Sequence, residues 1–307
     1  MEEEPKKKPW DSTLKSLDTE EFIDMRFYRP IGYRWALLFN KLGLSPNFIT
    51  ITGIFIGIAA GICFYYQSLY VNVIGMLLLV WANMYDSADG QLARMTGKKS
   101  ALGRILDGLC GDLWFVTIYI AIILRLYPSW GFWILILAFT TGYFHRMQAA
   151  LADYYRNAHL FFLKGKSGSE LSDSAQLKIN FKKTSREQNF IFKVFDYSYI
   201  GYTKGQESWT PEFQRMMKII REKYPDGAPQ WFRTAFREKS LPLMKYTNML
   251  SFNTRVIVLF ISLFLDKPWL YFIFELTVLN AMLIYMVFKH EHICAGFVKQ
   301  LTEENHD

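Results

Sequence analysis

The sequence predicts an all-α integral membrane protein with six transmembrane helices, an N-terminal interfacial helix and a cytoplasmic insertion between helices 4 and 5. Apolar runs recur that are long enough to cross a bilayer as helices. Hydrophobic residues make up 51% of the 307 residues, yet 21% are charged. Most of those charges lie in the N-terminal arm and between about 156 and 250, so a polar part accompanies the membrane part.

Residues 1–45 are predicted to form a cytoplasmic arm and an interfacial helix. The opening MEEEPKKKP lacks the apolar core and cleavage site of a signal peptide, so we expect the arm to be retained. From Asp18 to Leu44, apolar and basic residues interleave, which is typical of a helix lying at a membrane surface. Pro30 predicts a break in it. A soluble cap helix is the alternative.

Residues 46–155 are predicted to contain membrane helices 1–4. The first run starts at Pro46 and contains the apolar stretch ITITGIFIGIAAGICFYY. Asn47 precedes this stretch, and Thr50 lies near its start. Either polar side chain can cap the helix or face a ligand. The next three runs cover residues 71–86, 105–126 and 130–151.

The cytoplasmic insertion is predicted over 156–250, where glycine and proline turns separate polar, aromatic and basic segments. Residues 211–224 read as a short helix whose apolar face consists of Phe213, Met217 and Ile220. Residues 251–307 are predicted to hold the last two membrane helices, at 256–265 and 269–288, and a cytoplasmic tail.

The distribution of basic residues predicts the orientation. With a cytoplasmic amino terminus, the outer connections contain only Arg125 and Lys267. The net charge of +7 favours contact with anionic lipid headgroups. The apolar helices make membrane lipid, and not nucleic acid, the expected partner.

Acidic residues stand between the second and third apolar runs, where ionisable groups usually have a function. On a helix, Asp86 and Asp89 share one face with Gly90 and Ala93. Asp107 follows on the next helix, between small residues at Gly103 and Gly111. Three carboxylates around one polar hollow can hold a divalent cation, and nearby basic residues favour an anionic ligand. These basic residues are Arg94, Lys98, Lys99 and Arg104.

The pattern Asp86-x2-Asp89-Gly90-x2-Ala93-Arg94-x8-Gly103-x3-Asp107 resembles the signature of the CDP-alcohol phosphotransferases, membrane enzymes that build phospholipid headgroups. The resemblance implies that Mg²⁺ or Mn²⁺ is bound by the three aspartates. It also implies that Gly90, Ala93 and Gly103 leave room for the nucleotide and that Arg94 pairs with its phosphate. Asn47 and Thr50 match a Pro-Asn-x-x-Thr opening whose side chains face the ligand.

One position departs from the family pattern. The fourth aspartate of the family falls on Gly111, whereas this chain has Asp112. On a regular helix Asp112 is rotated by about 140° from Asp107. A π-bulge near Gly108 or Gly111 would bring it back, and Asp112 would then act as the catalytic base beside Asp107. A different base, or a catalytically silent family member, is the alternative.

The resemblance implies transfer of a phosphatidyl group from a CDP-alcohol, with CDP-diacylglycerol as the expected donor, to a small hydroxyl acceptor, with release of CMP. The expected acceptor is a polyol phosphate such as inositol phosphate or glycerol phosphate, whose phosphate Arg146 and Arg255 would bind. For Arg156 we expect ordinary anchoring. An aminoalcohol phosphotransferase using CDP-choline or CDP-ethanolamine, and a silent metal-binding membrane partner, are the alternatives. A homodimer is one option for assembly.

The three cysteines, Cys63, Cys110 and Cys294, have no CxxC spacing, so reduced thiols are expected. His290 and His292 lie near Cys294, but we expect no metal site there because no acidic partner or second ligand pair was evident.

Overall fold

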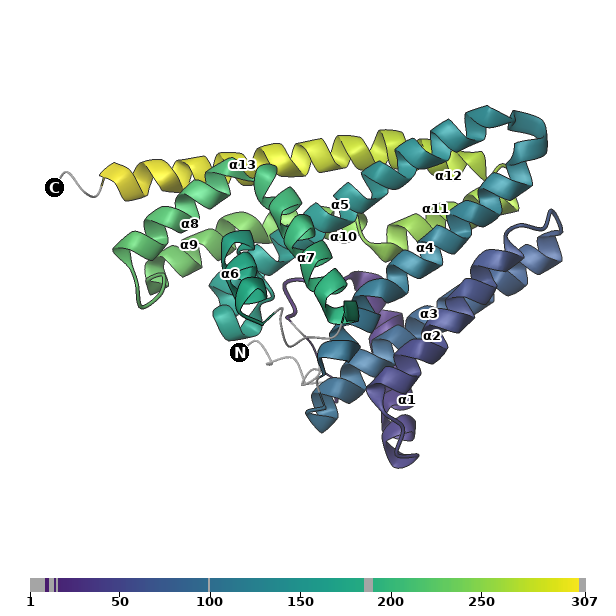
Figure 1. Ribbon diagram of the computed structural model, residues 1–307, viewed down its shortest axis with the longest axis horizontal. Helices are drawn as coiled ribbons and strands as arrows, with labels where there is room; N and C mark the ends of the chain where they lie inside the picture. Colours follow the sequence, from purple (N-terminus) through teal and green to yellow (C-terminus); the bar gives the residue numbers. More distant parts are fainter. Residues whose placement is uncertain (1–8, 11–13, 15, 99, 185–189, 304–307) are drawn as a thin grey trace, which may run out of the picture. The chain divides into compact units, whose positions relative to one another are not determined.

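The computed structural model describes residues 9–10, 14, 16–98, 100–184 and 190–303, and within them the regular structure is helical (Figure 1). The all-α prediction is therefore confirmed for this part of the chain. The α-helices are α1 (Arg29–Lys41), α2 (Pro46–Cys63), α3 (Leu69–Thr96), α4 (Ala101–Trp130), α5 (Phe132–Lys164), α6 (Ser174–Thr184), α7 (Phe190–Ser208), α8 (Pro211–Lys223), α9 (Gln230–Ser240), α10 (Met244–Met249), α11 (Phe252–Phe264), α12 (Trp269–Phe274) and α13 (Asn280–Glu303). Short π-helical turns lie at Asp24–Tyr28 and Glu275–Leu279, and 3-10 turns at Lys166–Gly168 and Leu241–Leu243.

Several helical stretches have the length and hydropathy to cross a bilayer, which indicates a multi-pass membrane protein. Among the described residues there are five, at Pro46–Cys63, Leu69–Thr96, Leu102–Trp130, Gln230–Phe264 and Trp269–Glu303. The run predicted at 130–151 falls in α5, which is not one of them. The count of six membrane helices is thus not confirmed.

Contacts divide the chain into two compact units. The first comprises Met1–Tyr143 and Arg255–Phe274, and the second comprises Phe144–Thr254 and Glu275–Asp307. Each boundary between them falls within or at the end of a helix: inside α5, inside α11 and after α12. The segments predicted from chain order, with an insertion at 156–250, remain a prediction about membrane topology.

In the first unit, α2 packs against both α3 and α4, and α1 packs against α3. Trp114 of α4 lies across α2, where its indole N–H donates to the carbonyl of Gly53 at 3.2 Å. A Cβ atom on Gly57 would lie 2.1 Å from the indole nitrogen, so only glycine permits this approach. At the other end of α4, buried Arg125 donates to the Phe64 carbonyl at 3.1 Å and pairs with Asp266 at 2.6 Å.

The N-terminal helix does not break at Pro30. The π-helical turn Asp24–Tyr28 leads directly into α1, and Tyr28 and Arg29 both have helical dihedral angles. Because proline lacks an N–H group, the continuous helix lacks one backbone hydrogen bond at Pro30. The break expected there is absent, and the irregularity in this part of the helix is the π-helical turn that precedes Pro30.

The second unit has an aromatic core. Its fully buried members include Tyr155 and Phe162 of α5, Phe213 of α8, Phe232 and Phe236 of α9, and Phe297 of α13. The predicted apolar face of α8 is confirmed, since Phe213, Met217 and Ile220 are all buried.

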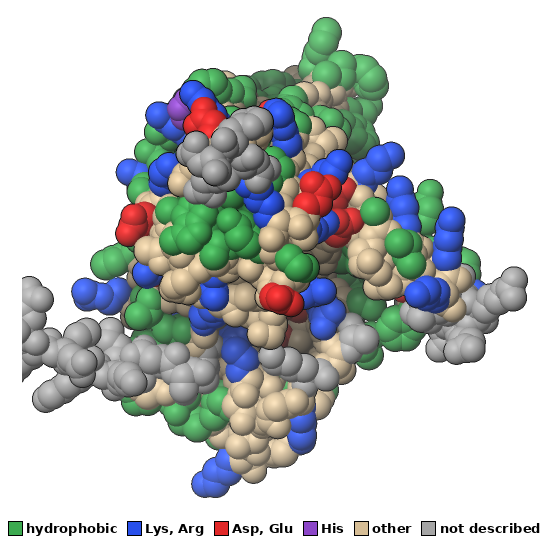
Figure 2. Space-filling view, turned by 90° about the vertical axis from the view of Figure 1, so that its left-hand side faces the viewer, with side chains coloured by type: hydrophobic (Ala, Val, Ile, Leu, Met, Phe, Trp, Pro, Cys, Tyr) green, Lys and Arg blue, Asp and Glu red, His purple; other side chains and the backbone are tan. Residues whose placement is uncertain are grey.

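Lys and Arg side chains are dispersed among other residues on the face shown in Figure 2, where they form no single patch among the residues drawn in colour.

Candidate active site

The acidic motif is carried by α3 and α4, and the turn between them has distinct end signals. Gly97 closes α3 in the left-handed conformation, with φ of 66°. The Ser100 hydroxyl accepts a hydrogen bond from the Gly103 backbone N–H at 2.9 Å and so caps α4. The turn separates the two halves of the motif, with α3 ending at Thr96 and α4 beginning at Ala101.

The three predicted metal ligands come together. The ligand oxygens of Asp86, Asp89 and Asp107 lie within 4.8 Å of one another. Asp89 is buried, Asp86 is half-buried and Asp107 is exposed. Carboxylates this close repel one another, and a hard divalent cation with oxygen ligands would remove that repulsion. The donor set therefore fits Mg²⁺ or Mn²⁺.

The start of α2 holds the acidic group from one side. Thr50 is buried, and its hydroxyl donates to Asp89 Oδ2 at 2.5 Å. The Asn47 side-chain oxygen accepts from the Ser100 hydroxyl at 3.3 Å. A Cβ atom on Gly103 would lie 2.7 Å from that same oxygen. Both side chains predicted to face a ligand thus contact the motif itself, which explains why position 103 carries no side chain.

The Arg94 side chain lies over Gly90, which precedes it by one helical turn on α3. A Cβ atom on Gly90 would lie 3.2 Å from Arg94 Nη2, so the missing side chain makes room for the guanidinium group. Arg94 Nε is buried and has no hydrogen-bond partner among the described residues. A buried donor without a partner is costly, and an anionic ligand would satisfy it. Ala93 is half-buried on the same helix.

Backbone carbonyls at the start of the N-terminal helix also contact the motif helix α3, a contact that was not predicted. The Gln91 amide donates to the Arg29 carbonyl at 3.1 Å, and the Ser87 hydroxyl donates to the Tyr28 carbonyl at 3.3 Å. The Arg29 side chain forms an ion pair with Glu20 at 2.9 Å. Both of these charges interact electrostatically with Arg94. The hydroxyl and amide spaced four apart on α3 are the only trace of this contact in the sequence.

The predicted π-bulge in α4 is wrong. The helix is α-helical from Ala101 to Trp130, so Asp112 stays about 140° around the helix from Asp107. Asp112 is exposed and is not one of the three clustered aspartates. Buried Cys110 lies beside the acidic group instead and hydrogen-bonds with Asp86, a contact that the sequence analysis missed. A Cβ atom on Gly111 would meet nothing within 4 Å.

The three arginines considered for the acceptor differ in burial. Arg255 of α11 is 1% exposed, which makes it one of the largest fully buried side chains. Arg146 is exposed in the second unit. Arg156, in the same unit, donates to Ser251 at 2.8 Å and to Asn248 at 3.3 Å. A structural role for Arg156 agrees with these contacts.

Comparison with known proteins identifies the region that carries this site. Residues 43–159 match the sequence model of the CDP-alcohol phosphatidyltransferase family. Archaetidylinositol phosphate synthase from Pyrococcus horikoshii is 34% identical over 36% of this chain and 58% of its own length. A putative cardiolipin synthase from Mycobacterium tuberculosis is 29% identical over 30% of this chain and 44% of its own. No solved structure matches the chain.

The matched relatives are therefore covered only in part, over 58% and 44% of their lengths. The matched region runs from the turn before α2 into α5, and it includes all three clustered aspartates as well as Thr50 and Arg94. This chain accordingly contains a CDP-alcohol phosphatidyltransferase domain at residues 43–159.

Proposed function

We propose that this domain transfers a phosphatidyl group from a CDP-alcohol, with CDP-diacylglycerol as the donor, to the hydroxyl group of a polyol phosphate. The clustering of Asp86, Asp89 and Asp107 within 4.8 Å carries the proposal. The partnerless Arg94 Nε supports it, because it offers a charged hydrogen bond to a phosphate beside those carboxylates. We expect the domain to face the cytoplasm, where the nucleotide is available.

In the proposed reaction, the acceptor oxygen attacks the phosphorus of the phosphatidyl phosphate. The bond to the bridging pyrophosphate oxygen breaks, and CMP leaves with the bonding electrons. Mg²⁺ or Mn²⁺ bound by the three aspartates would neutralise the phosphoryl oxygens and the departing CMP. Thr50 holds the buried Asp89 carboxylate in place, while Arg94 pairs with phosphate and Gly90 and Gly103 leave space for the nucleotide.

The acceptor hydroxyl must lose a proton to a base. Whether the domain has such a base distinguishes an active transferase from a catalytically silent protein. Asp112 lies on another side of α4, so it is no longer the best candidate. Asp107 is the exposed carboxylate of the clustered three, and we propose that it takes the proton. Gly111, at the position of the family's fourth aspartate, favours the competing proposal of a silent, metal-binding membrane partner.

Inositol phosphate is the acceptor that we place first. The name of the Pyrococcus relative, archaetidylinositol phosphate synthase, supports an inositol phosphate product. Glycerol phosphate remains the second choice. Arg255, in the first unit with the aspartates, is proposed to bind the acceptor phosphate. For Arg146, in the second unit, the same role remains a separate proposal from the sequence.

The test is release of labelled CMP by the purified full chain in lipid nanodiscs. CDP-diacylglycerol is supplied with Mg²⁺ and with inositol phosphate, glycerol phosphate or no acceptor. Parallel reactions contain diacylglycerol with CDP-choline or CDP-ethanolamine. We expect CMP release with inositol phosphate. Turnover only with a CDP-aminoalcohol would support the aminoalcohol alternative, and metal binding without CMP release in any reaction would support the silent alternative.

A further inference from the structure

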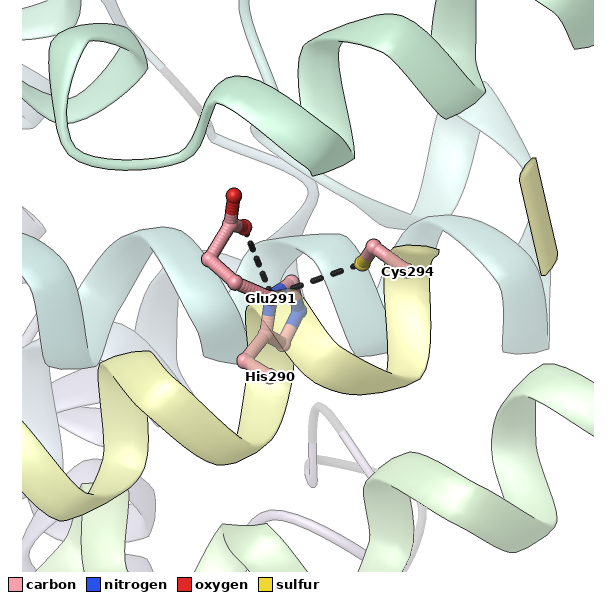
Figure 3. A group of neighbouring side chains, drawn as sticks. All are labelled: His290, Glu291 and Cys294. Atoms are coloured by element: carbon pink, nitrogen blue, oxygen red, sulfur yellow. Dashed lines mark hydrogen bonds and ion pairs between the residues drawn. The ribbon is translucent and has the colours of Figure 1, made fainter. Parts of the chain in front are cut away.

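A second group of potential metal ligands lies on α13, in the second unit. His290 and Glu291 are neighbours on this helix, Cys294 follows one turn later, and the three side chains lie close together (Figure 3). His290 is 1% exposed and Cys294 is fully buried. The acidic partner that was not expected for His290 is the adjacent Glu291.

The distances within this group match those of a metal centre. The Cys294 sulfur lies 3.6 Å from His290 Nδ1, and Glu291 Oε1 lies 3.7 Å from the same nitrogen. All three ligand atoms lie within 4.8 Å of one another. Around a tetrahedral Zn²⁺ ion, with bonds of about 2.0 to 2.3 Å, neighbouring ligand atoms are separated by about 3.5 Å. A small shift of the side chains would close the group around an ion.

One proposed ligand atom of the group lacks a hydrogen bond: Glu291 Oε1 is buried and has no hydrogen-bond partner among the described residues. The other carboxylate oxygen, Oε2, accepts from the Glu212 backbone N–H at 2.6 Å, at the start of α8. That bond holds the carboxylate between α13 and the start of α8, while Oε1 has no hydrogen bond and only the imidazole 3.7 Å away. A buried carboxylate oxygen in this state is costly, and a bound cation would remove the cost.

The surroundings are aromatic. The Tyr155 ring lies 4.1 Å from the His290 ring, and the Phe213 ring lies 5.4 Å away, both measured between centroids. In such surroundings a net charge is costly. A divalent cation bound by one thiolate, one carboxylate and one neutral imidazole has a net charge of zero, which suits this environment.

We propose that His290 Nδ1, Glu291 Oε1 and Cys294 Sγ bind a zinc ion. A thiolate with an imidazole favours zinc over Mg²⁺, which prefers oxygen ligands only. The three protein ligands leave one coordination position open. Because Glu291 is also held by the start of α8, the ion would fasten α13 to α8 and stabilise the second unit. This site is separate from the aspartate group, whose oxygen ligands suit a hard cation.

The test measures zinc retained by the purified full chain after washing with excess Mg²⁺, which competes for the aspartate group. We expect one zinc ion per chain by elemental analysis. Cys294→Ser and His290→Ala should lower zinc affinity by more than about tenfold, since even indirect contacts to a metal are worth that much. Matched controls are Cys63→Ser, which removes a half-buried thiol of the first unit, and His292→Ala, which removes the exposed neighbouring imidazole. Both controls should retain zinc.

A second measurement needs no substitution at the site. Co²⁺ added to the wild-type chain should produce a thiolate-to-cobalt charge-transfer band and the visible bands of a tetrahedral ion, and zinc should abolish them. Asp107→Asn should leave these bands unchanged. Absence of bound zinc together with absence of the cobalt bands would overturn the proposal, and so would equal zinc retention by the wild type and Cys294→Ser.

Discussion

Thr50 and Asp89 are joined by a hydrogen bond of 2.5 Å between α2 and the acidic motif on α3. Both side chains are at least 95% buried, so water cannot replace the bond. The opening of α2 and the motif therefore form one structural element. Hydrogen bonds to charged groups are among the stronger contributions in proteins, so this pair should determine the orientation of the Asp89 carboxylate.

Replacement of Thr50 by valine should weaken metal binding by about tenfold or more, because the buried Asp89 oxygen would lose its donor while the side-chain volume stays the same. The measurement is a Mn²⁺ titration followed by CMP release. Thr50→Ser keeps the hydroxyl and is the matched control. Equal metal affinity of Thr50→Val and the wild type would mean that the bond does not orient a ligand.

Single asparagine replacements at Asp86, Asp89 and Asp107 should each abolish metal-dependent CMP release, because an amide has no charge with which to hold the cation. Helical content and detergent stability should be preserved, as circular dichroism and thermal unfolding would show. Asp112→Asn is the matched control outside the cluster. Near-normal turnover in any of the three would remove that residue from the metal site.

Asp112→Asn itself should lower turnover by less than about tenfold, whereas loss of a general base costs roughly 10² to 10⁴. The reason is geometric, since Asp112 is exposed on an unbroken helix, away from Asp107. Gly111→Asp should fold normally, because its side chain would start in open space, and should raise turnover if a base is what the site lacks. A loss of more than about 10² in Asp112→Asn would restore Asp112 as the base.

Gly103→Ala should impair the domain because its methyl group would lie 2.7 Å from the Asn47 side-chain oxygen. We expect lower thermal stability and lower CMP release. In an Asn47→Ala background the closest contact is gone and only the Ser100 hydroxyl oxygen, at 3.0 Å, still crowds the methyl group. The added cost of Gly103→Ala should therefore be smaller there than in the wild type. Additive losses in the double variant would show that position 103 is constrained by something other than Asn47.

The Asp173–Arg221 pair of the second unit should make stability depend on pH. Burial raises the pKa of Asp173, but hydrogen bonds from Arg221 and from the Gln176 and Ala175 backbone N–H groups outweigh it, and the pKa lies below 3.8. A lowered pKa in the folded state stabilises the protein above the ordinary pKa, and this stabilisation disappears as pH falls through the lowered value. Arg221→Gln should therefore lower the thermal midpoint at neutral pH, and less so at about pH 2.5. Lys218→Gln, which removes an exposed pair, should change it little at either pH.

The sequence by itself determined the helical class, the apolar runs and the three aspartates of the site. These are local properties: a period of 3.6 residues decides which side chains share a face, and hydropathy decides which runs avoid water. The spacing of Asp86 and Asp89 was enough to place both on one side of α3.

Only the tertiary structure decided which groups meet across helices. Thr50 binds Asp89 and Asn47 lies against Gly103 because α2 packs against both motif helices, and no local pattern encodes that contact. Whether α4 contains a π-bulge at Gly108 or Gly111 was also not decided by the sequence, since glycine permits a π-bulge without requiring one. The thiol, imidazole and carboxylate of α13 became a candidate metal site only through burial against α8 and the aromatic core. Packing withdraws water from polar groups, and that loss of solvent creates the demand for a partner.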